Sequence, residues 1–566
     1  MRAITLAISF IAATVLPAQE RARGPVPPDQ IFAGRFITLD SVLPRADAIA
    51  VRHGIITAIG TRAHVDSTAG PATRHTELPG VALPGFADAH AHPYALGELG
   101  ETLNLGTLSK AEILRRVRRA AAAAPAGQWI RGAMWDQSSW NPPEFPTATD
   151  LDSVSAGHPV LLHRLDGHAV WINSRALRLS GISRGRADPA GGQIVRDLRG
   201  DPTGVLVDAA IEPVMRVVPP PSARVVERRL RAALTQYATW GLTGVHDAEA
   251  GLREIAVYRS LAARGLLPLR IYAMAVARDS TLAQTLARGP EIGVGNGMFT
   301  LRSVKIVLDG ALGSRGAQLS APYSDAPTQR GLSLLSDARL DSIIGASVAR
   351  GFQVNVHAIG DEANHRVLDA FERAGPAARR LRFRVEHVSM LRDGDVPRFA
   401  RLGVIASMQP VFVGEYSRFA EARVGAARLP WVYRTRDVVE SGALVVSGSD
   451  FPASDAGDPV STLVSLVTRR GANGTPPGGW LPDQRVGVDV ALRSMTTGPA
   501  YAAFADRELG ALGVGRRADV TVLSADPNAI PIDELRSLRV LMTIVDGRTT
   551  YRAPHLVSRT SRRVRR

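Results

Sequence analysis

A chain of 566 residues, 45% of them hydrophobic and 21% charged, can bury a large core, which excludes a disordered protein. The absence of cysteine excludes disulfides and thiolate ligands, so any metal must be held by histidine, a carboxylate or a modified lysine. The formal net charge is +15, but the arginines are spread along the chain and form no known nucleic-acid-binding motif, so no nucleic-acid partner is predicted.

The first residues have the features of a secretory signal peptide. Arg2 precedes an apolar run over residues 3–16, which small and polar residues follow. We therefore expect residues 1–18 to be removed and the mature protein to be periplasmic or secreted. The run is short for a membrane span, so no stable membrane insertion is expected after cleavage. Leu16 is a weak fit to the cleavage pattern, which leaves an uncleaved anchor as the alternative.

Short strand-like segments occupy both ends of the remaining chain. They lie at residues 35–39, 48–51 and 55–59, and again at 519–523 and 540–545, where Asp546 and Gly547 supply a turn. The two sets are predicted to pair into one small β-sandwich domain, built from residues 25–84 and 501–553. Residues 554–566 hold a dense group of arginines and are predicted to form a disordered basic tail.

Between these ends, apolar β-rich runs alternate with helical runs rich in Ala, Leu and Arg, which is the pattern of parallel β/α units. The predicted fold class is therefore α/β, with a TIM (β/α)8 barrel over residues 85–500. The gap between the first two strands is too long for one crossover helix, so about residues 107–222 are predicted to be an insertion placed where it can cover the site. The eight strands are predicted at residues 81–92, 241–248, 269–276, 301–309, 352–358, 383–388, 403–409 and 443–450.

Two histidines close the first predicted barrel strand. His90 and His92 are two residues apart, and in an extended strand end such residues point the same way, so both can reach one ion. Alone, the pair is as well explained by two polar residues at a loop entrance. His357, His387 and Asp450 each close a later apolar run. Because barrel active sites lie at the carboxyl ends of the strands, we expect these five side chains to converge on a metal site there.

Lys305 lies inside another predicted strand, among β-branched residues. It is one of only two lysines among 68 basic residues, the other being Lys110. A buried unpaired ammonium is costly, and a desolvated amine can become neutral and reactive whereas a guanidinium stays protonated. Beside five metal ligands we expect Lys305 to be carboxylated by CO2 and to bridge two metals; by itself an ordinary paired lysine would explain it.

The order of these residues resembles the amidohydrolase superfamily, whose opening motif is similar to PGFADAHAH at residues 84–92. More narrowly, the chain resembles the YtcJ-like branch, amidohydrolase family 3, which includes N-substituted formamide deformylase. The likeness spans about residues 32–545. It rests further on DGH at 166–168, NS at 173–174, Lys305, DG at 309–310, SR at 314–315, HAIGD at 357–361, EH at 386–387 and SD at 449–450.

The resemblance implies two metal ions, with a bridging water whose pKa is lowered to about 7 so that hydroxide forms near neutral pH. Two Zn²⁺ per chain suit nitrogen and oxygen ligands, and manganese, iron or cobalt suit them as well. Asp450 is also the expected catalytic residue, because it would pass a proton from the attacking water to the leaving nitrogen. In this arrangement one metal is bound by His90, His92 and Asp450, the other by His357 and His387, and carboxylated Lys305 bridges them.

Three side chains are candidates for holding the substrate carbonyl or a polar substituent: His168, Arg315 and Tyr323. Structural roles are the alternatives for two of them. His168 could fasten the insertion, and Arg315 could pair with Asp309 or Asp325.

Asp361 and Glu386 adjoin predicted ligands and are expected to orient imidazoles from outside the metal site. Gly316 departs from the family pattern, which has a small hydroxyl residue there, so a contact in that loop is expected to be missing. This affects substrate detail and not the metals.

The predicted function is metal-dependent hydrolysis of a non-peptide carbon–nitrogen bond in a small linear amide or formamide-type molecule, through a metal-bridging hydroxide. A mononuclear-metal deaminase is the first alternative, but Gly360 replaces its usual glutamate, and Lys305 would have no role there. Esterase or lactonase action fits the same chemistry. A non-enzymatic binding protein is disfavoured because no ligand of the set is missing. A homo-oligomer stays open.

Overall fold

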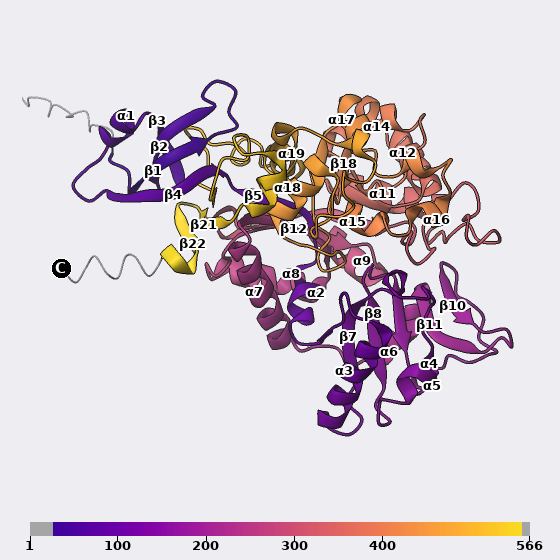
Figure 1. Ribbon diagram of the computed structural model, residues 1–566. Coiled ribbons are helices and arrows are strands. Elements are labelled where there is room, and N and C mark those ends of the chain that lie inside the picture. The colour runs from indigo at the N-terminus through magenta and orange to yellow at the C-terminus, as the bar shows by residue number, and fades with distance from the viewer. Residues whose placement is uncertain (1–25, 557–566) are drawn as a thin grey trace, which may run out of the picture.

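The computed structural model describes residues 26–556, which contain three β-sheets with helices around them (Figure 1). The predicted signal peptide and residues 557–566 of the predicted basic tail lie outside the described residues. Over residues 26–556, no helix is both long enough and apolar enough to cross a membrane.

Eight parallel strands form the centre of the molecule, and each pairs with the next barrel strand along the chain. This confirms the predicted α/β fold class with a (β/α)8 barrel. A short strand, β14 (Glu291–Gly293), pairs antiparallel with the fourth barrel strand. The barrel strands are β5 (Phe86–Ala91), β12 (Leu242–Ala250), β13 (Arg270–Val276), β15 (Phe299–Val307), β16 (Gln353–Ala358), β17 (Arg384–His387), β18 (Ile405–Met408) and β19 (Val445–Ser447).

The barrel is nearly closed between its last strand and its first. The backbone N–H of Asp450 donates to the carbonyl of His90 at 2.7 Å, just beyond the end of β19. Ser449 donates to the carboxylate of Asp88 through its backbone N–H at 3.0 Å and its hydroxyl at 2.6 Å. Gly448 permits this approach, because a Cβ atom there would lie 2.4 Å from the backbone nitrogen of His90. The closure therefore sets His90 and Asp450 side by side.

Helices cover the outside of the barrel. In amphipathic helices such as α7, apolar residues recur every three or four positions and bury one stripe against the strands, whereas α18 is buried on nearly all sides. In α7, for example, Val226, Leu230, Ala233 and Leu234 are buried. The longer helices that precede or follow the barrel strands are α7 (Ala223–Thr239), α8 (Leu252–Ala263), α9 (Asp279–Arg288), α11 (Asp337–Ala349), α12 (Asp361–Arg373), α14 (Val396–Leu402), α17 (Thr435–Glu440), α18 (Pro459–Thr468), α19 (Val488–Ser494) and α20 (Thr497–Ala502), and shorter ones are α10 (Val294–Gly297), α13 (Pro376–Arg380) and α16 (Ala420–Val424).

The first predicted barrel strand, residues 81–92, is two strands in the structure, so the prediction of one strand is wrong. Strand β4 (Arg74–Pro84) belongs to the terminal sheet, and β5 belongs to the barrel. Gly85 lies between them, and its N–H donates to the carbonyl of Asp519 at 2.9 Å. A Cβ atom at Gly85 would lie 2.1 Å from the hydroxyl of Thr243. The apolar run is continuous in the sequence because both strands are buried.

Both ends of the described chain share one seven-stranded sheet. This part was predicted as a sandwich, and in the structure it is one curled sheet. The N–H of Ile56, in β3, donates to the carbonyl of Arg516 at 2.8 Å and joins β3 to the segment before β20. Phe32, Ile49 and Met542 share its core. In order across the sheet the strands are β22 (Arg548–Arg552), β21 (Val540–Val545), β20 (Val520–Leu523), β4, β1 (Gln30–Ile37), β2 (Arg45–Arg52) and β3 (Ile55–Gly60), with α1 (Arg62–Asp66) beside them.

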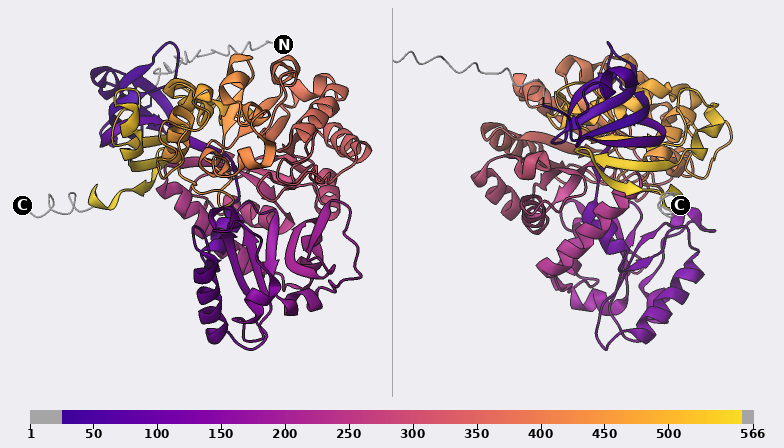
Figure 2. Two further views of the ribbon diagram at one scale, coloured as in Figure 1. Left: turned by 45° about the vertical axis from the view of Figure 1, so that its right-hand side comes forward. Right: turned by 90° about the vertical axis from the view of Figure 1, so that its left-hand side faces the viewer.

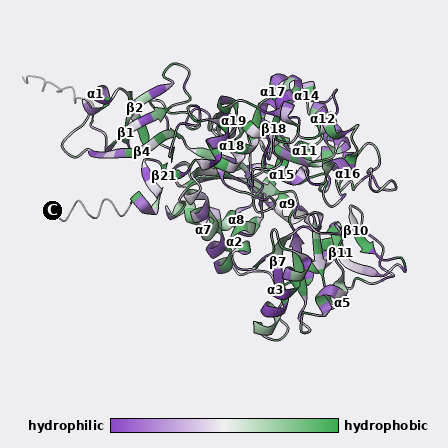
Figure 3. Ribbon diagram, in the orientation of Figure 1, coloured by the Kyte–Doolittle hydropathy of each residue, from purple (hydrophilic) through white to green (hydrophobic). Residues whose placement is uncertain are grey.

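The long segment between β5 and α7 forms an inserted subdomain with a sheet of its own, reached through α2 (Pro93–Leu99). Figure 2 shows this subdomain and the terminal sheet on different sides of the barrel. Its helix α3 (Lys110–Ala123) buries Ile113, Val117 and Ala121 and carries hydrophilic residues on its other side (Figure 3). The strands are β6 (Leu103–Asn104), β7 (Ile130–Trp135), β8 (Val160–Arg164), β9 (Ala169–Ile172), β10 (Gly192–Arg196) and β11 (Pro202–Asp208), with α4 (Ala148–Asp152), α5 (Ser174–Leu179) and α6 (Glu212–Val217).

Candidate active site

The six side chains predicted to bind metal lie at the carboxyl ends of barrel strands, where the active sites of this fold are built. Five of them belong to residues that are at most 5% exposed, and the side chain of His92 is 19% exposed. Four histidines, one lysine and one carboxylate are thus collected in a buried space. They are His90 in β5, His92 directly after it, Lys305 in β15, His357 in β16, His387 at the end of β17 and Asp450 after β19.

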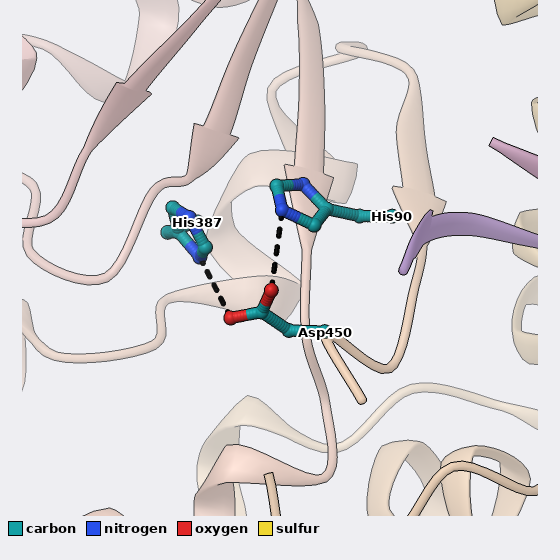
Figure 4. Close-up of side chains that lie close together, drawn as sticks. All are labelled: His90, His387 and Asp450. Carbon is teal, nitrogen blue, oxygen red and sulfur yellow. Dashed lines mark ion pairs between the residues drawn. The ribbon is translucent and has the colours of Figure 1, made fainter. Parts of the chain in front are cut away.

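The carboxylate of Asp450 lies at the centre of this group. Its Oδ1 atom is 2.8 Å from Nε2 of His92 and 3.3 Å from Nε2 of His90. Its Oδ2 atom is 3.9 Å from Nδ1 of His387. Figure 4 shows the carboxylate between the rings of His90 and His387. One ligand atom from each of these three residues lies within 4.8 Å of the others, which is close enough for one ion.

Two polar side chains fix the orientation of the His90 and His387 rings. Oε2 of Glu386 lies 2.6 Å from Nδ1 of His90, and Oε1 of Gln409 lies 2.8 Å from Nδ1 of His387. Glu386 is itself paired with the fully buried Arg384 at 2.8 Å. Because Nδ1 of each ring is bound in this way, Nε2 of both rings is left for a metal ligand bond.

Burial and neighbouring charges set the protonation states. Burial lowers the pKa of His357 and of His387 well below the usual value, so both rings are neutral at neutral pH. Burial opposes ionisation of Asp450, but the adjoining His90 outweighs it and holds the pKa of that carboxyl well below its usual range. Burial also lowers the pKa of Lys305. Neutral imidazoles and an ionised carboxylate are the forms that bind metals.

Two further nitrogen atoms belong to the same space. Nζ of Lys305 lies 3.3 Å from Nε2 of His90. Nε2 of His357 is buried without a hydrogen-bond partner, although Oδ1 of Asp309 is 3.5 Å away and the ring of His387 lies 4.4 Å from its own, centre to centre. A buried polar atom without a partner costs folding free energy, so this nitrogen indicates a position where a ligand binds.

The inserted subdomain brings His168 to this site. The ring of His168 lies 5.0 Å from that of His357, centre to centre. Its Nδ1 atom is 2.5 Å from Oδ1 of Asp208, and its side chain is 17% exposed. Burial opposes the charged form of His168, but the Asp208 carboxylate outweighs it and raises the pKa to about 9. An imidazolium from the insertion therefore stands over a barrel histidine at neutral pH.

Ion pairs connect the insertion to the barrel mouth. Arg418, which follows α15 (Phe412–Tyr416) of the barrel, pairs with Asp136 of the insertion at 3.3 Å. Within the insertion, Arg164 pairs with Asp136 at 2.6 Å and with Asp166 at 2.5 Å. The other oxygen of Asp166 accepts the backbone N–H of His168 at 3.1 Å. These contacts shape the loop that carries His168.

Two of the predicted substrate-binding side chains, Tyr323 and Arg315, form hydrogen bonds with other parts of the protein. Tyr323 is 1% exposed, and its hydroxyl donates to the carbonyl of Ala317 at 2.8 Å, so it belongs to the core. Arg315 binds Asp325 through two hydrogen bonds of 3.1 and 3.0 Å. Each side chain has a protein partner, and the role of Tyr323 and Arg315 in holding the substrate stays a prediction.

Asp361 does not contact a predicted ligand imidazole. Its carboxylate accepts the backbone N–H of Ser320 at 3.2 Å and pairs with Arg392 at 3.0 Å. It therefore holds the loop after β15 against the start of α12. Adjacency to His357 in the sequence motif suggested an orienting role, but the chain turns into α12 at this residue and carries the side chain away.

Two residues at the site were not singled out from the sequence. Gln409, which orients His387, stands at the end of a predicted strand, and a polar residue closing an apolar run is the same signal that found the histidines. Val307 is 39% exposed although it lies in a barrel strand. It is two residues from Lys305 and pairs in register with His357, so its side chain points into the barrel mouth. A lone valine in an apolar strand gives no sequence signal.

Comparison with known proteins agrees with this geometry. The profile of the Amidohydrolase family matches residues 80–551, so the chain belongs to the amidohydrolase family. The expectation of an amidohydrolase, an enzyme that hydrolyses carbon–nitrogen bonds, is confirmed at the level of the family.

Two relatives cover nearly the whole chain. The YtcJ protein of Bacillus subtilis (strain 168) is 33% identical over 92% of this chain and 99% of its own length. N-substituted formamide deformylase of Arthrobacter pascens is 30% identical over 91% of this chain and 96% of its own. A metal-dependent hydrolase from Pyrococcus horikoshii OT3 has a TM-score of 0.72 and 26% identity, over 89% of this chain and 99% of that structure.

Proposed function

We propose that this chain hydrolyses a linear amide or formamide-type bond of a small molecule at the cluster of His90, His92, Lys305, His357, His387 and Asp450. The observation that carries the proposal is the buried Nε2 of His357, which lacks a hydrogen-bond partner and lies beside the convergent donors of His90, His387 and Asp450. The activity of the Arthrobacter pascens relative supports the choice of bond.

The donor set fits a metal ion. Imidazole nitrogens and a carboxylate suit zinc, and their number exceeds what one tetrahedral ion needs, which supports two ions per chain. A bound metal would lower the pKa of a water molecule to about 7 and polarise the carbonyl of the substrate. Glu386 and Gln409 would keep the inner nitrogens of His90 and His387 aimed at it.

Asp450 would move the proton. Its carboxylate is ionised and lies against His90 and His92, so it can accept a proton from the attacking water. The water oxygen forms the new bond to the carbonyl carbon, the carbon–nitrogen bond breaks, and Asp450 delivers the proton to the departing nitrogen. Protonation is needed because an amide anion is a poor leaving group.

Lys305 would become a carbamate. Its amine is buried and its pKa is lowered, which favours the neutral form that attacks CO2. The nitrogen forms a bond to the carbon of CO2, one proton is released, and the product is a carboxylate on the lysine. This group would add an anionic oxygen ligand next to His90, where Nζ now lies 3.3 Å from Nε2.

His168 would contact the substrate, because its ring stands over His357 and its side chain is partly exposed. The N-terminal sequence supports export, so the substrates would be external amides or acylated amino compounds. Recovery of the protein from the cytoplasm with residues 1–18 intact would contradict this part of the proposal.

A mononuclear deaminase and an esterase or lactonase are the competing functions. Lys305 distinguishes the deaminase from our proposal, because a one-metal site gives this lysine no role. Hydrolysis rates on matched amide and ester substrates distinguish an esterase or lactonase from an amidase.

The experiment is metal content per chain, by elemental analysis, for protein expressed with bicarbonate, together with hydrolysis of N-substituted formamides. Wild type is expected to hold about two metals per chain and to release formate. Lys305→Ala and Lys305→Arg are expected to lose metal and to lose at least about a hundredfold in kcat/KM, since neither can form the carbamate.

Lys110→Arg is the matched control, because Lys110 is the chain's other lysine and forms an exposed ion pair with Asp150. It should retain metal and activity. One metal per chain in wild type, unchanged in both Lys305 variants, would contradict the bridging role and favour the deaminase.

A further inference from the structure

Asp208, at the end of β11 in the inserted subdomain, has two carboxylate oxygens in different situations. Oδ1 lies 2.5 Å from Nδ1 of His168. Oδ2 is buried and has no hydrogen-bond partner. The side chain of Asp208 is 4% exposed. A buried carboxylate oxygen without a hydrogen-bond partner lowers the stability of the fold, so folding does not explain why an aspartate stands at this position.

The backbone of Asp208 is also in an unfavourable conformation. Its φ is +49° and its ψ is −120°, outside the regions that residues with a side chain ordinarily adopt. The backbone N–H donates to the carbonyl of His168 at 2.9 Å. The chain is thus bent so that the carboxylate of Asp208 meets the ring of His168, and such local strain is concentrated at functional sites.

The barrel leaves room for this carboxylate through two glycines in the loop after β15. A Cβ atom at Gly310 would lie 2.3 Å from Oδ2 of Asp208, and one at Gly316 would lie 2.8 Å from it. Gly310 donates its N–H to the carbonyl of Gly316 at 3.2 Å, which holds the two glycines together. Asp208 therefore touches the barrel and His168 at once.

Because Nδ1 of His168 is engaged by Asp208, Nε2 is the atom left for a ligand. Nε2 of His168 has no protein partner among the described residues, and the side chain is 17% exposed. Its ring lies 5.0 Å from that of His357, whose own Nε2 has no partner. Two unpaired ring nitrogens, one from the insertion and one from the barrel, thus border the same space.

We propose that Asp208 is a positioning residue: seated against Gly310 and Gly316, it holds His168 so that Nε2 of His168 binds a polar atom of the substrate next to the scissile bond. The inference rests on the proposed function for the identity of the reaction. It makes substrate binding depend on the seating of the inserted subdomain on the barrel.

The test is a double-mutant cycle on wild type, His168→Ala, Asp208→Ala and the double variant, each with measured metal content, kcat and KM for an N-substituted formamide. Each single variant should lose at least about tenfold in kcat/KM with metal content unchanged. If Asp208 acts through His168, the double variant should be within about threefold of His168→Ala, because residues that act as a unit are not additive.

If Asp208→Ala folds poorly, two other variants and a control still test the positioning role of Asp208. Asp208→Asn keeps the shape and one acceptor oxygen, so it should recover part of the lost activity. Gly316→Ala should displace the carboxylate and reproduce the Asp208→Ala defect. Asp201→Ala is the control: this residue lies on the same hairpin in an exposed pair with Arg184, and its loss should change nothing.

A second measurement works without turnover. In metal-free protein, proton NMR should show a far-downfield imidazole N–H from the bond between His168 and Asp208, absent in either alanine variant and present in Asp201→Ala. Addition of the N-substituted formamide should shift it. If the loaded wild type hydrolyses no amide while this shift is present, the proposed function fails and the positioning role stands.

Additive losses in the cycle, or a resonance that does not respond to the formamide, would overturn the inference. The first would make Asp208 a support of the fold alone, and the second would remove His168 from the substrate site.

Discussion

At the scale of single residues, the exposure of Val307 predicts a limit on substrate size. Val307 lies between Lys305 and Asp309 and points into the barrel mouth beside His357, yet it is 39% exposed. Val307→Phe should fill this space and lower kcat/KM by about tenfold or more for amides with a bulky aliphatic group, and less for simple formamides, because such pockets discriminate by size. Steady-state kinetics over two series, varied on the acyl and on the amine side, measures this.

Val514→Phe is the control for that experiment, because Val514 is 67% exposed in a loop before β20, far along the chain from the site. It should leave all rates unchanged. An equal loss on every substrate with Val307→Phe would mean that the residue supports the site and does not set its size.

His163 predicts a pH dependence of stability. Burial lowers the pKa of this β8 histidine to about 4, so the unfolded chain takes up a proton before the folded one. Stability is therefore retained above the unfolded pKa of about 6.5 and lost as pH falls from there toward 4. Between pH 7 and 5, His163 should contribute about 1–2 kcal/mol to the loss, so the loss should be smaller by that amount in His163→Gln. Urea unfolding at both pH values checks this; equal pH dependence in the two proteins would contradict it.

At the scale of elements, Gly448 predicts the dependence of the site on barrel closure. A Cβ atom there would lie 2.4 Å from the backbone nitrogen of His90, and backbone cannot yield as a flexible side chain would. Gly448→Ala should separate β19 from β5, lower the free energy of unfolding by about 2 kcal/mol or more and reduce metal content. Gly394→Ala is the matched control, because nothing lies within 4 Å of its added atom.

A metal content for Gly448→Ala equal to that of wild type would show that His90 and Asp450 do not need this closure. Thermal unfolding separates a change in stability from a change at the site alone.

The barrel strands could be predicted because they are apolar runs, and several are closed by a polar residue at the mouth, as β16 is by His357. The position of Gly85 could not, since two buried strands in different sheets read as one run. Asp361 was assigned from the motif at residues 357–361, and a motif gives sequence proximity without the direction of a side chain. Its carboxylate pairs with Arg392 and contacts no predicted ligand imidazole.

The contacts of Asp208 could not be predicted from the sequence, because they join elements that are far apart in the chain. Asp208 is 40 residues from His168 in the sequence, and three barrel strands separate it from Gly310 along the chain. Only the folded insertion brings these residues together. A carboxylate at a strand end has many ordinary explanations in a sequence. Only the structure shows that one carboxylate oxygen of Asp208 has no hydrogen-bond partner and that Gly310 and Gly316 lie against it.

At the scale of the whole molecule, one buried ionic cluster joins the terminal sheet to the barrel. Arg270 begins β13 at the end of the barrel opposite the site and pairs with Asp519 through bonds of 2.7 and 2.9 Å. It also binds Asp546, which precedes the last hairpin strand. All three side chains are less than 10% exposed. The C-terminal strands of the terminal sheet are thus held on the barrel through one guanidinium.

Removal of that guanidinium should leave the buried carboxylate of Asp519 without its cation, whereas Asp546 keeps its pair with Arg517 at 3.1 Å. Arg270→Ala is expected to lower the free energy of unfolding by about 3–5 kcal/mol, as for other broken buried pairs. Arg45→Ala, which breaks an exposed pair with Asp526, should cost about 1 kcal/mol or less.

Because Arg270 and Lys305 lie toward opposite ends of the barrel, the metal content of the folded Arg270→Ala variant should match that of wild type. Asp519→Asn in the Arg270→Ala background should restore part of the stability by removing the unpaired charge. If Arg270→Ala proves no more destabilising than Arg45→Ala in chemical denaturation, the terminal sheet is held by apolar packing, and the cluster only sets its orientation.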